Sequence, residues 1–163
     1  MPDAAASITA EQDDRILRLS VDDGGRNIFT LPLARELHDR IRAAEADSAI
    51  TTLVLEGNGR ALSVGLDTGT VLAGGAEADA LLGTMGEILR LLYLSRLRSV
   101  VIASGHAVAA GAMLLLVADT RIGIAPGGRV GLSEVGVGLP VPAATQQLVR
   151  DRIAVPYQYE STA

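Results

Sequence analysis

Apolar and polar residues alternate over residues 16–21 (ILRLSV), which predicts a strand with one buried face. Between residues 31 and 46, apolar residues recur every three or four positions with charged residues between them, and this spacing predicts an amphipathic helix. The same pattern predicts a longer helix over residues 77–98. Continuous apolar runs at residues 50–55 and 99–103 predict strands of a parallel sheet that is covered on both faces.

The apolar stretch at residues 99–118 is about as long as a membrane-spanning helix. A polar and glycine-containing break at residues 104–106 divides it, which favours a buried strand, a turn and a buried helix. A further strand is expected at residues 120–125, and residues 146–153 look like part of a last helix. Alternating strands and helices in a chain of 163 residues predict one α/β domain with mainly parallel pairing.

Composition removes several classes of function. The chain has no Cys and no Lys, which excludes disulfides, thiolate catalysis, Schiff-base chemistry and a P-loop lysine. Its two histidines, His38 and His106, are too few for a convincing metal cluster, so no metal site is expected. A net charge of −5 argues against a nucleic-acid partner. Because the N-terminus is acidic and lacks an apolar core, we expect no secretory signal, no membrane association and a cytoplasmic location.

Two short motifs come close to known signatures and fail at one position each. Residues 57–59 (GNG) begin like a dinucleotide-binding fingerprint, but Leu62 stands where the third glycine belongs. Residues 131–135 (GLSEV) resemble a nucleophile elbow, but Val135 replaces its final glycine. A serine hydrolase would also need one of the two histidines as base. A turn in the first case and a structural role in the second are the simpler interpretations.

Two loops rich in small residues form a stronger pair. Residues 61–67 (ALSVGLD) follow one predicted buried strand, and residues 105–111 (GHAVAAG) follow another and open a helix. Ligand crevices of α/β sheets form at these strand ends, and a helix start offers unpaired N–H groups. Two such groups aimed at one oxygen make an oxyanion hole. Tight packing of strand against helix also selects Ala and Gly, so both interpretations stay open at this point.

Glu134 is the candidate acid–base residue. It lies among Val, Leu and Gly in residues 128–140, where loss of hydration would raise the pKa of its carboxyl group. A solvated loop glutamate is the alternative.

In this order, the segments resemble the crotonase superfamily, the enoyl-CoA hydratase/isomerase family. The resemblance is carried by residues 53–67 (LVLEGNGRALSVGLD), 99–122 (SVVIASGHAVAAGAMLLLVADTRI) and 131–148 (GLSEVGVGLPVPAATQQL). It implies a spiral of ββα units with a mainly parallel sheet flanked by helices. Residues 1–163 are expected to form a single crotonase-like domain that lacks the family's C-terminal helical region, as a fragment or a shortened form.

The resemblance also implies roles for individual residues. The backbone amides of Val64 and Ala110 would hold the thioester oxygen in an oxyanion hole. Arg60, Ala61 and Leu66 would border coenzyme A, which is part of the substrate, so no separate cofactor is expected. The implied partner is an acyl-CoA small molecule, and the implied assembly is a homo-oligomer, a trimer or a dimer of trimers.

Hydratases of this family use two glutamates, and this chain keeps one of them. Met113 occupies the position of the first acid, and Glu134 matches the second. A methionine can neither hold nor protonate water, which makes 2-enoyl-CoA hydration the less favoured reaction. Isomerisation of a 3-enoyl-CoA to a 2-enoyl-CoA needs one glutamate and is the favoured reaction. A catalytically silent acyl-CoA-binding or assembly subunit is the alternative from another functional class.

Overall fold

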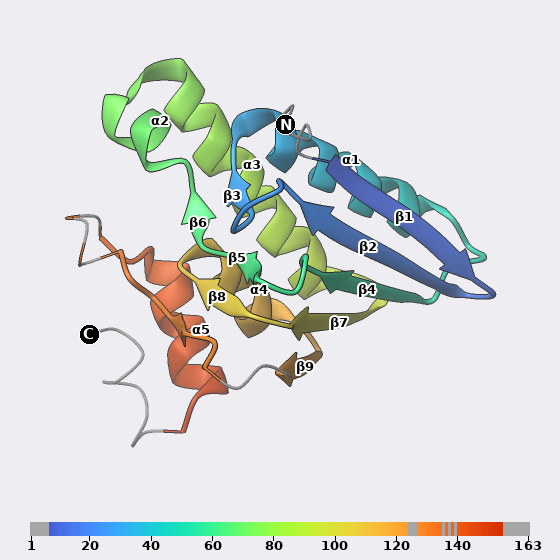
Figure 1. Ribbon diagram of the computed structural model, residues 1–163. Helices are drawn as coiled ribbons and strands as arrows, with labels where there is room; N and C mark the ends of the chain where they lie inside the picture. The colour runs from blue at the N-terminus through green and yellow to red at the C-terminus, as the bar shows by residue number, and fades with distance from the viewer. Residues whose placement is uncertain (1–6, 124–126, 135, 137, 139, 155–163) are drawn as a thin grey trace.

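The computed structural model describes residues 7–123, 127–134, 136, 138 and 140–154 (Figure 1). Its strands are β1 (Ser7–Asp13), β2 (Ile16–Asp22), β3 (Ile28–Phe29), β4 (Thr52–Glu56), β5 (Ala61–Ser63), β6 (Gly65–Leu66), β7 (Arg98–Ala103), β8 (His106–Val108), β9 (Thr120–Gly123) and β10 (Val130–Gly131). Its helices are α1 (Leu31–Ala46), α2 (Thr68–Ala73), α3 (Gly75–Leu94), α4 (Ala110–Val117) and α5 (Ala143–Arg152).

The main sheet has five strands in the order β1-β2-β4-β7-β9. β1 and β2 form an antiparallel hairpin, and the other three pairings are parallel. The expected α/β fold with a mainly parallel sheet is therefore confirmed. The strand β1 was not predicted, because its exposed positions include acidic residues and its sequence resembles a polar N-terminal tail.

Helices α1 and α3 lie side by side and cover one face of the main sheet (Figure 1). The predicted helix at residues 31–46 coincides with α1, which has Pro at its first turn, where the fixed φ of proline suits a helix start. The second predicted helix was too long, because α3 ends at Leu94 and Arg98 already begins β7. Leu82 fits the apolar spacing of α3 but is 49% exposed.

Two smaller sheets position the loops of interest. One has the order β10-β8-β5, with parallel pairing throughout, and the other pairs β3 with β6 in parallel. The two loops predicted at residues 61–67 and 105–111 are thus partly strands, β5 with β6 and β8, and β5 pairs directly with β8. This pairing brings together the two loops that were predicted from the sequence to form one site.

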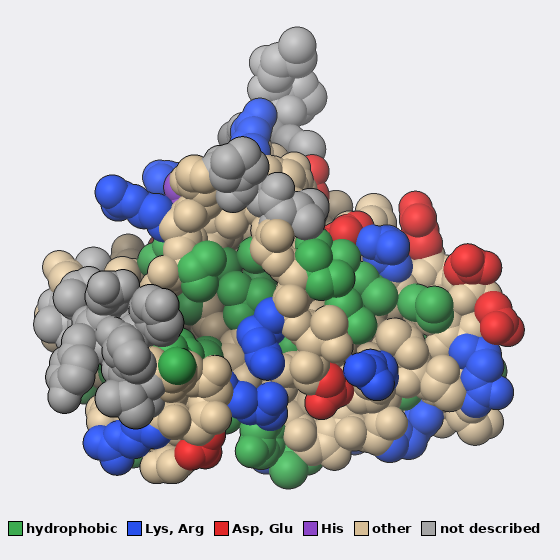
Figure 2. Space-filling model, turned by 90° about the horizontal axis from the view of Figure 1, so that it is seen from below, with side chains coloured by type: hydrophobic (Ala, Val, Ile, Leu, Met, Phe, Trp, Pro, Cys, Tyr) green, Lys and Arg blue, Asp and Glu red, His purple; other side chains and the backbone are tan. Residues whose placement is uncertain are grey.

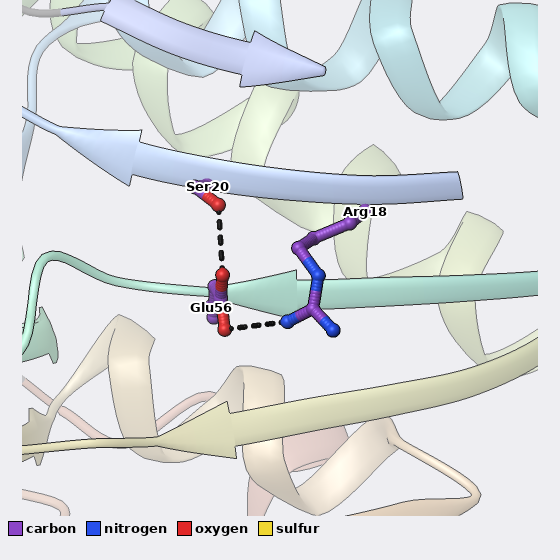
Figure 3. Close-up of polar contacts among 3 residues, drawn as sticks. All are labelled: Arg18, Ser20 and Glu56. Atoms are coloured by element: carbon purple, nitrogen blue, oxygen red, sulfur yellow. Dashed lines mark hydrogen bonds and ion pairs between the residues drawn. The ribbon is translucent and has the colours of Figure 1, made fainter. Parts of the chain in front are cut away.

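The opposite face of the main sheet carries a polar cluster across β2 and β4 (Figure 3). The Glu56 carboxylate accepts hydrogen bonds from Arg18 and from the Ser20 hydroxyl, each at 2.9 Å. Ser20 and Glu56 are register partners in the parallel pair, so the contact joins neighbouring side chains. Because Arg18 is 43% exposed on its side chain, water screens this pair and its contribution to stability is small.

Hydrophobic side chains also reach the surface. Figure 2 shows a face whose centre gathers hydrophobic side chains with basic ones among them. The most exposed large apolar residues include Leu72 and Leu94, each 65% exposed, and Val130 at 63%.

None of the helices in the described part of the chain is long and apolar enough to cross a membrane. The predicted homo-oligomer stays a prediction.

Asn27 is a buried polar residue that joins β2 to β5. Its side chain is fully buried, and its Nδ2 donates to the carbonyls of Val21 and Ala61, each at 2.9 Å. Its Oδ1 accepts from the Asp23 amide at 3.0 Å, and its own carbonyl accepts from the Ser63 hydroxyl at 2.6 Å. Asn27 therefore ties the end of β2 to β5, on which the first loop of the site is built.

Replacing Asn27 with Ala should lower the free energy of unfolding by about 2 kcal/mol, because it leaves buried carbonyls without donors. Asn27 also has φ +57°, a conformation that Gly adopts without strain. Asn27→Gly should therefore be less damaging than Asn27→Ala, although both lose the same hydrogen bonds. Urea denaturation of the three proteins measures both effects. Equal stability of wild type and Asn27→Ala would contradict this role.

Candidate functional site

A cavity of about 860 Å³ lies between β6, α2, α3, α4 and α5. Most of its wall is apolar, from Val64, Leu66, Val71, Leu82, Met85, Leu89, Met113, Val117 and Leu148. Its polar side chains are few and include Thr68, Arg90, Ser133, Glu134, Thr145, Gln147 and Asp151. A large apolar cavity with a few polar groups is typical of a small-molecule site.

Glycines allow the backbone segments around this cavity to approach one another closely. A methyl group on Gly111, in the first turn of α4, would lie 2.3 Å from the Ser63 carbonyl oxygen. A methyl group on Gly105, before β8, would lie 2.0 Å from the Arg60 carbonyl oxygen. Real side chains do not approach backbone this closely, so only glycine fits at either position. These contacts bear out close backbone packing, one of the two alternatives from the sequence; the ligand-facing backbone stays a prediction.

The amide of Ala110 opens α4 and lies on the cavity wall. As the first residue of the helix, Ala110 has no intrahelical acceptor for its N–H group, and the positive end of the helix dipole lies there. In contrast, the preceding amide of Ala109 donates to Gly131 O at 2.9 Å, and the Met113 amide donates to Ala109 O at 3.0 Å. The structure thus places the predicted donor Ala110 at a position suited to a ligand oxygen.

The second predicted donor, Val64, lies on the same wall, but its amide is engaged. It donates to the Arg26 carbonyl at 3.2 Å, which counts against Val64 as a donor to a ligand. Two residues later, Leu66 also lines the cavity. The Asp67 amide donates to Phe29 O at 2.9 Å, and consecutive amides of a strand point to opposite sides. The Leu66 amide therefore points away from β3.

Glu134 is buried on the cavity wall, as its apolar surroundings predicted. The residue is 8% exposed, and within the described part of the chain its Oε2 has no hydrogen-bond partner. Burial raises the pKa of the Glu134 carboxyl above its usual value, and the residue's own amide offsets this only in part. A carboxyl group with a free oxygen and a raised pKa is equipped to exchange protons with a ligand.

Met113 lies on the same cavity wall and is 7% exposed. Its sulfur accepts a hydrogen bond from the Thr145 hydroxyl at 3.5 Å. Thr145 is 3% exposed and also lines the cavity, from the first turns of α5. Thr145 was not predicted from the sequence, because an isolated threonine in a polar helix carries no signal. Its contact with Met113 depends on the packing of α5 against α4.

The residues expected beside coenzyme A are not all on the cavity wall. Ala61 is fully buried, and its carbonyl accepts from Asn27, so its side chain has no exposed surface to offer a ligand. Arg60 is exposed and donates to the Gly24 carbonyl at 3.2 Å, outside the cavity lining. Leu66 is the one of the three that lines the cavity. Contact of Arg60 and Ala61 with coenzyme A stays a prediction.

Both histidines have structural partners. His106 Nδ1 accepts from the Arg129 amide at 3.1 Å, and His38 Nδ1 lies 3.0 Å from Asp39 Oδ1. Neither lies on the wall of the main cavity. The residues that the structure describes include no group of three or more His, Cys, Asp or Glu side chains arranged to hold a metal ion. Asp67 caps α2, and hydrogen bonds from the Thr70 hydroxyl and amide lower its pKa, which indicates a structural role.

Comparison with known proteins gives a consistent result. Residues 11–156 match the family model of the enoyl-CoA hydratases/isomerases. The chain is 28% identical over 152 residues to a 2,3-dehydroadipyl-CoA hydratase of Escherichia coli. This alignment covers 89% of the chain and 57% of that relative. The chain therefore spans little more than half the length of this curated relative.

Solved structures agree with this match. An enoyl-CoA hydratase of Mycobacterium ulcerans superimposes with a TM-score of 0.87 at 29% identity, over 95% of this chain and 68% of that one. An enoyl-CoA isomerase of Mycobacterium tuberculosis gives a TM-score of 0.86 at 28% identity, over 96% of this chain and 67% of that one. The expected spiral α/β fold is thus confirmed, and similarity at this level does not separate hydratase from isomerase.

Proposed function

The chain belongs to the enoyl-CoA hydratase/isomerase family, and from this premise we propose that its cavity binds an acyl-CoA thioester and isomerises a 3-enoyl to a 2-enoyl group. The observation that carries the proposal is the pairing of Glu134 with Met113. The buried Glu134 carboxyl group and the Met113 thioether share the cavity with Ala110. This set supports a reaction that uses a single acid–base residue.

The proton transfer balances with this one residue. The Glu134 carboxylate takes a proton from C2 of the 3-enoyl thioester, and the electron pair of the broken C–H bond moves into an enolate whose charge lies on the thioester oxygen. The protonated Glu134 then returns the proton to C4, while the double bond moves to C2–C3. Glu134 ends as a carboxylate, and no other reactant is consumed.

The enolate oxygen needs two hydrogen-bond donors. The Ala110 amide is one, because at the start of α4 it has no acceptor within the helix. We assign the second to the Leu66 amide instead of Val64. Leu66 lines the cavity and its amide points away from β3, whereas the Val64 amide is bonded to Arg26. Donors held by a helix and a strand are fixed before the charge develops, which is what makes such a site effective.

Ultraviolet absorbance tests the proposal directly. With trans-3-hexenoyl-CoA as substrate, we expect the absorbance of the conjugated 2-enoyl thioester to rise. With 2-hexenoyl-CoA, we expect no loss of that absorbance, since Met113 cannot position a water. Loss of it would establish a hydratase. Tight thioester binding without any turnover of 3-hexenoyl-CoA would instead establish a silent binding subunit.

The pH dependence follows from the raised pKa of Glu134. The first step needs the carboxylate, so kcat should fall as the pH falls through the raised pKa, with a midpoint above the ordinary value of 4.5. Initial rates between about pH 4 and 8, with a check that the protein stays folded, measure this midpoint. A rate that is independent of pH down to 4.5 would contradict the assignment of Glu134 as base.

A further inference from the structure

Ala109, the residue before the proposed donor Ala110, has a strained backbone. Its φ is +50° and its ψ is −116°, at the N-terminal cap of α4. L-residues with a side chain adopt this region at a cost, and glycine adopts it freely. The folded state is therefore less stable with alanine at this position than it would be with glycine, so a role for the methyl group of Ala109 is expected.

The methyl group of Ala109 lies close to both segments of the proposed oxyanion site. Ala109 lines the cavity, and a methyl group on the neighbouring Gly65 would lie 3.0 Å from the Ala109 methyl carbon. The same point on Gly65 is 4.0 Å from the Ala110 nitrogen. The Ala109 methyl, the bare backbone of Gly65 and the Ala110 amide therefore meet in one small region, between the segments that supply the two donors.

Covalent geometry ties this methyl group to any bound thioester. The Ala109 methyl carbon is only three bonds from the Ala110 nitrogen, so an oxygen that accepts from that nitrogen lies beside the methyl group. The thioester carbonyl carbon and its C2 are the next atoms of the substrate. A substituent on C2 would have to share this space with the Ala109 methyl group.

We propose that Ala109 is a specificity-determining residue that restricts the site to acyl thioesters with an unbranched C2. The proposal rests on the function proposed above, because it assumes a thioester oxygen at the Ala110 amide. In Ala109→Gly the backbone conformation is kept without strain, and the space of one methyl group opens where the branch would lie.

Binding of two isomeric thioesters tests this proposal without depending on turnover. Butyryl-CoA and isobutyryl-CoA have the same atoms and differ in the branch at C2. By calorimetry, wild type should bind butyryl-CoA about tenfold more tightly, the scale set by one misplaced methyl group in a fitted pocket. In Ala109→Gly the two affinities should agree within about twofold, since the clash is removed. Ala43→Gly, which removes a methyl group from an exposed position of α1 outside the cavity lining, should keep the wild-type preference.

The outcomes separate the two proposals. Equal binding of the two thioesters by wild type, or a preference that survives in Ala109→Gly, overturns the role of Ala109 and leaves the proposed function standing. If wild type binds neither thioester, the proposed function fails and the role of Ala109 fails with it. A melting curve of each variant establishes that it is folded, and Ala109→Gly should melt at or above the wild-type temperature.

Discussion

Glu134→Gln is expected to lower the turnover of 3-hexenoyl-CoA by about 10³-fold, because an amide can neither take the C2 proton nor return it to C4. The amide has nearly the shape of the carboxyl group, so thioester binding should persist. Initial rates from the 2-enoyl absorbance give the loss of kcat, and calorimetry with butyryl-CoA gives the retained affinity. Turnover equal to that of wild type would exclude the single-glutamate mechanism.

Stability distinguishes this loss from unfolding. Since burial raises the pKa of Glu134, the folded state binds this proton more tightly than the unfolded chain does. The stability linked to Glu134 is therefore greatest below the ordinary pKa and is lost as the pH rises through the raised pKa. At neutral pH, Glu134→Gln removes that cost and should not lower the melting temperature. Glu87→Gln, on the exposed side of α3, is the matched control and should retain turnover.

Gly111→Ala should lower the free energy of unfolding by about 3 kcal/mol, an effect typical of severe overpacking. The added methyl group would lie 2.3 Å from the Ser63 carbonyl oxygen and 3.1 Å from its carbonyl carbon. Both are backbone atoms, so α4 must move away from β5 to accommodate it. Because Ala110 is the neighbouring residue, the displacement also moves the proposed oxyanion donor.

Urea denaturation measures the loss in Gly111→Ala, and binding of butyryl-CoA to the folded fraction reports on the donor. Gly83→Ala is the matched control, since Gly83 lies within α3 and a methyl group there would have no neighbour within 4 Å. That substitution should stabilise the protein by about 1 kcal/mol, because alanine favours a helix over glycine. If Gly111→Ala were as stable as wild type, the close approach of α4 to β5 would be wrong.

The sequence predicted the parts of the fold whose residues repeat a pattern over several turns or positions. The helix α1 was located to the residue, and the buried strands β4 and β7 to within two residues, because each presents one continuous apolar face. The burial of Glu134 also followed from its apolar neighbours, and its raised pKa agrees. Local composition was sufficient to predict burial and secondary structure wherever neighbours in the sequence determine the environment of a residue.

The short strands could not be predicted in this way. β5, β6 and β8 have two or three residues each and are paired with segments far away in the chain. Their small residues carry no periodicity, and the closeness of their backbones is set by contacts such as that between Gly111 and Ser63. For the same reason, the sequence does not show whether the Val64 or the Leu66 amide faces the cavity. That choice depends on how β6 pairs with β3, and a strand of two residues has no pattern that predicts its pairing.

The parallel order of β2, β4, β7 and β9 also has a kinetic consequence. Each of these three pairings joins strands separated by an intervening helix, whereas only β1 and β2 meet through a short turn. Loop closure over such distances must precede any gain from strand contacts, so we expect slow folding for a chain of this length. The β1–β2 hairpin can form early, but the proposed thioester site includes residues of β6, α4 and α5 and is complete only when the last of these segments has packed.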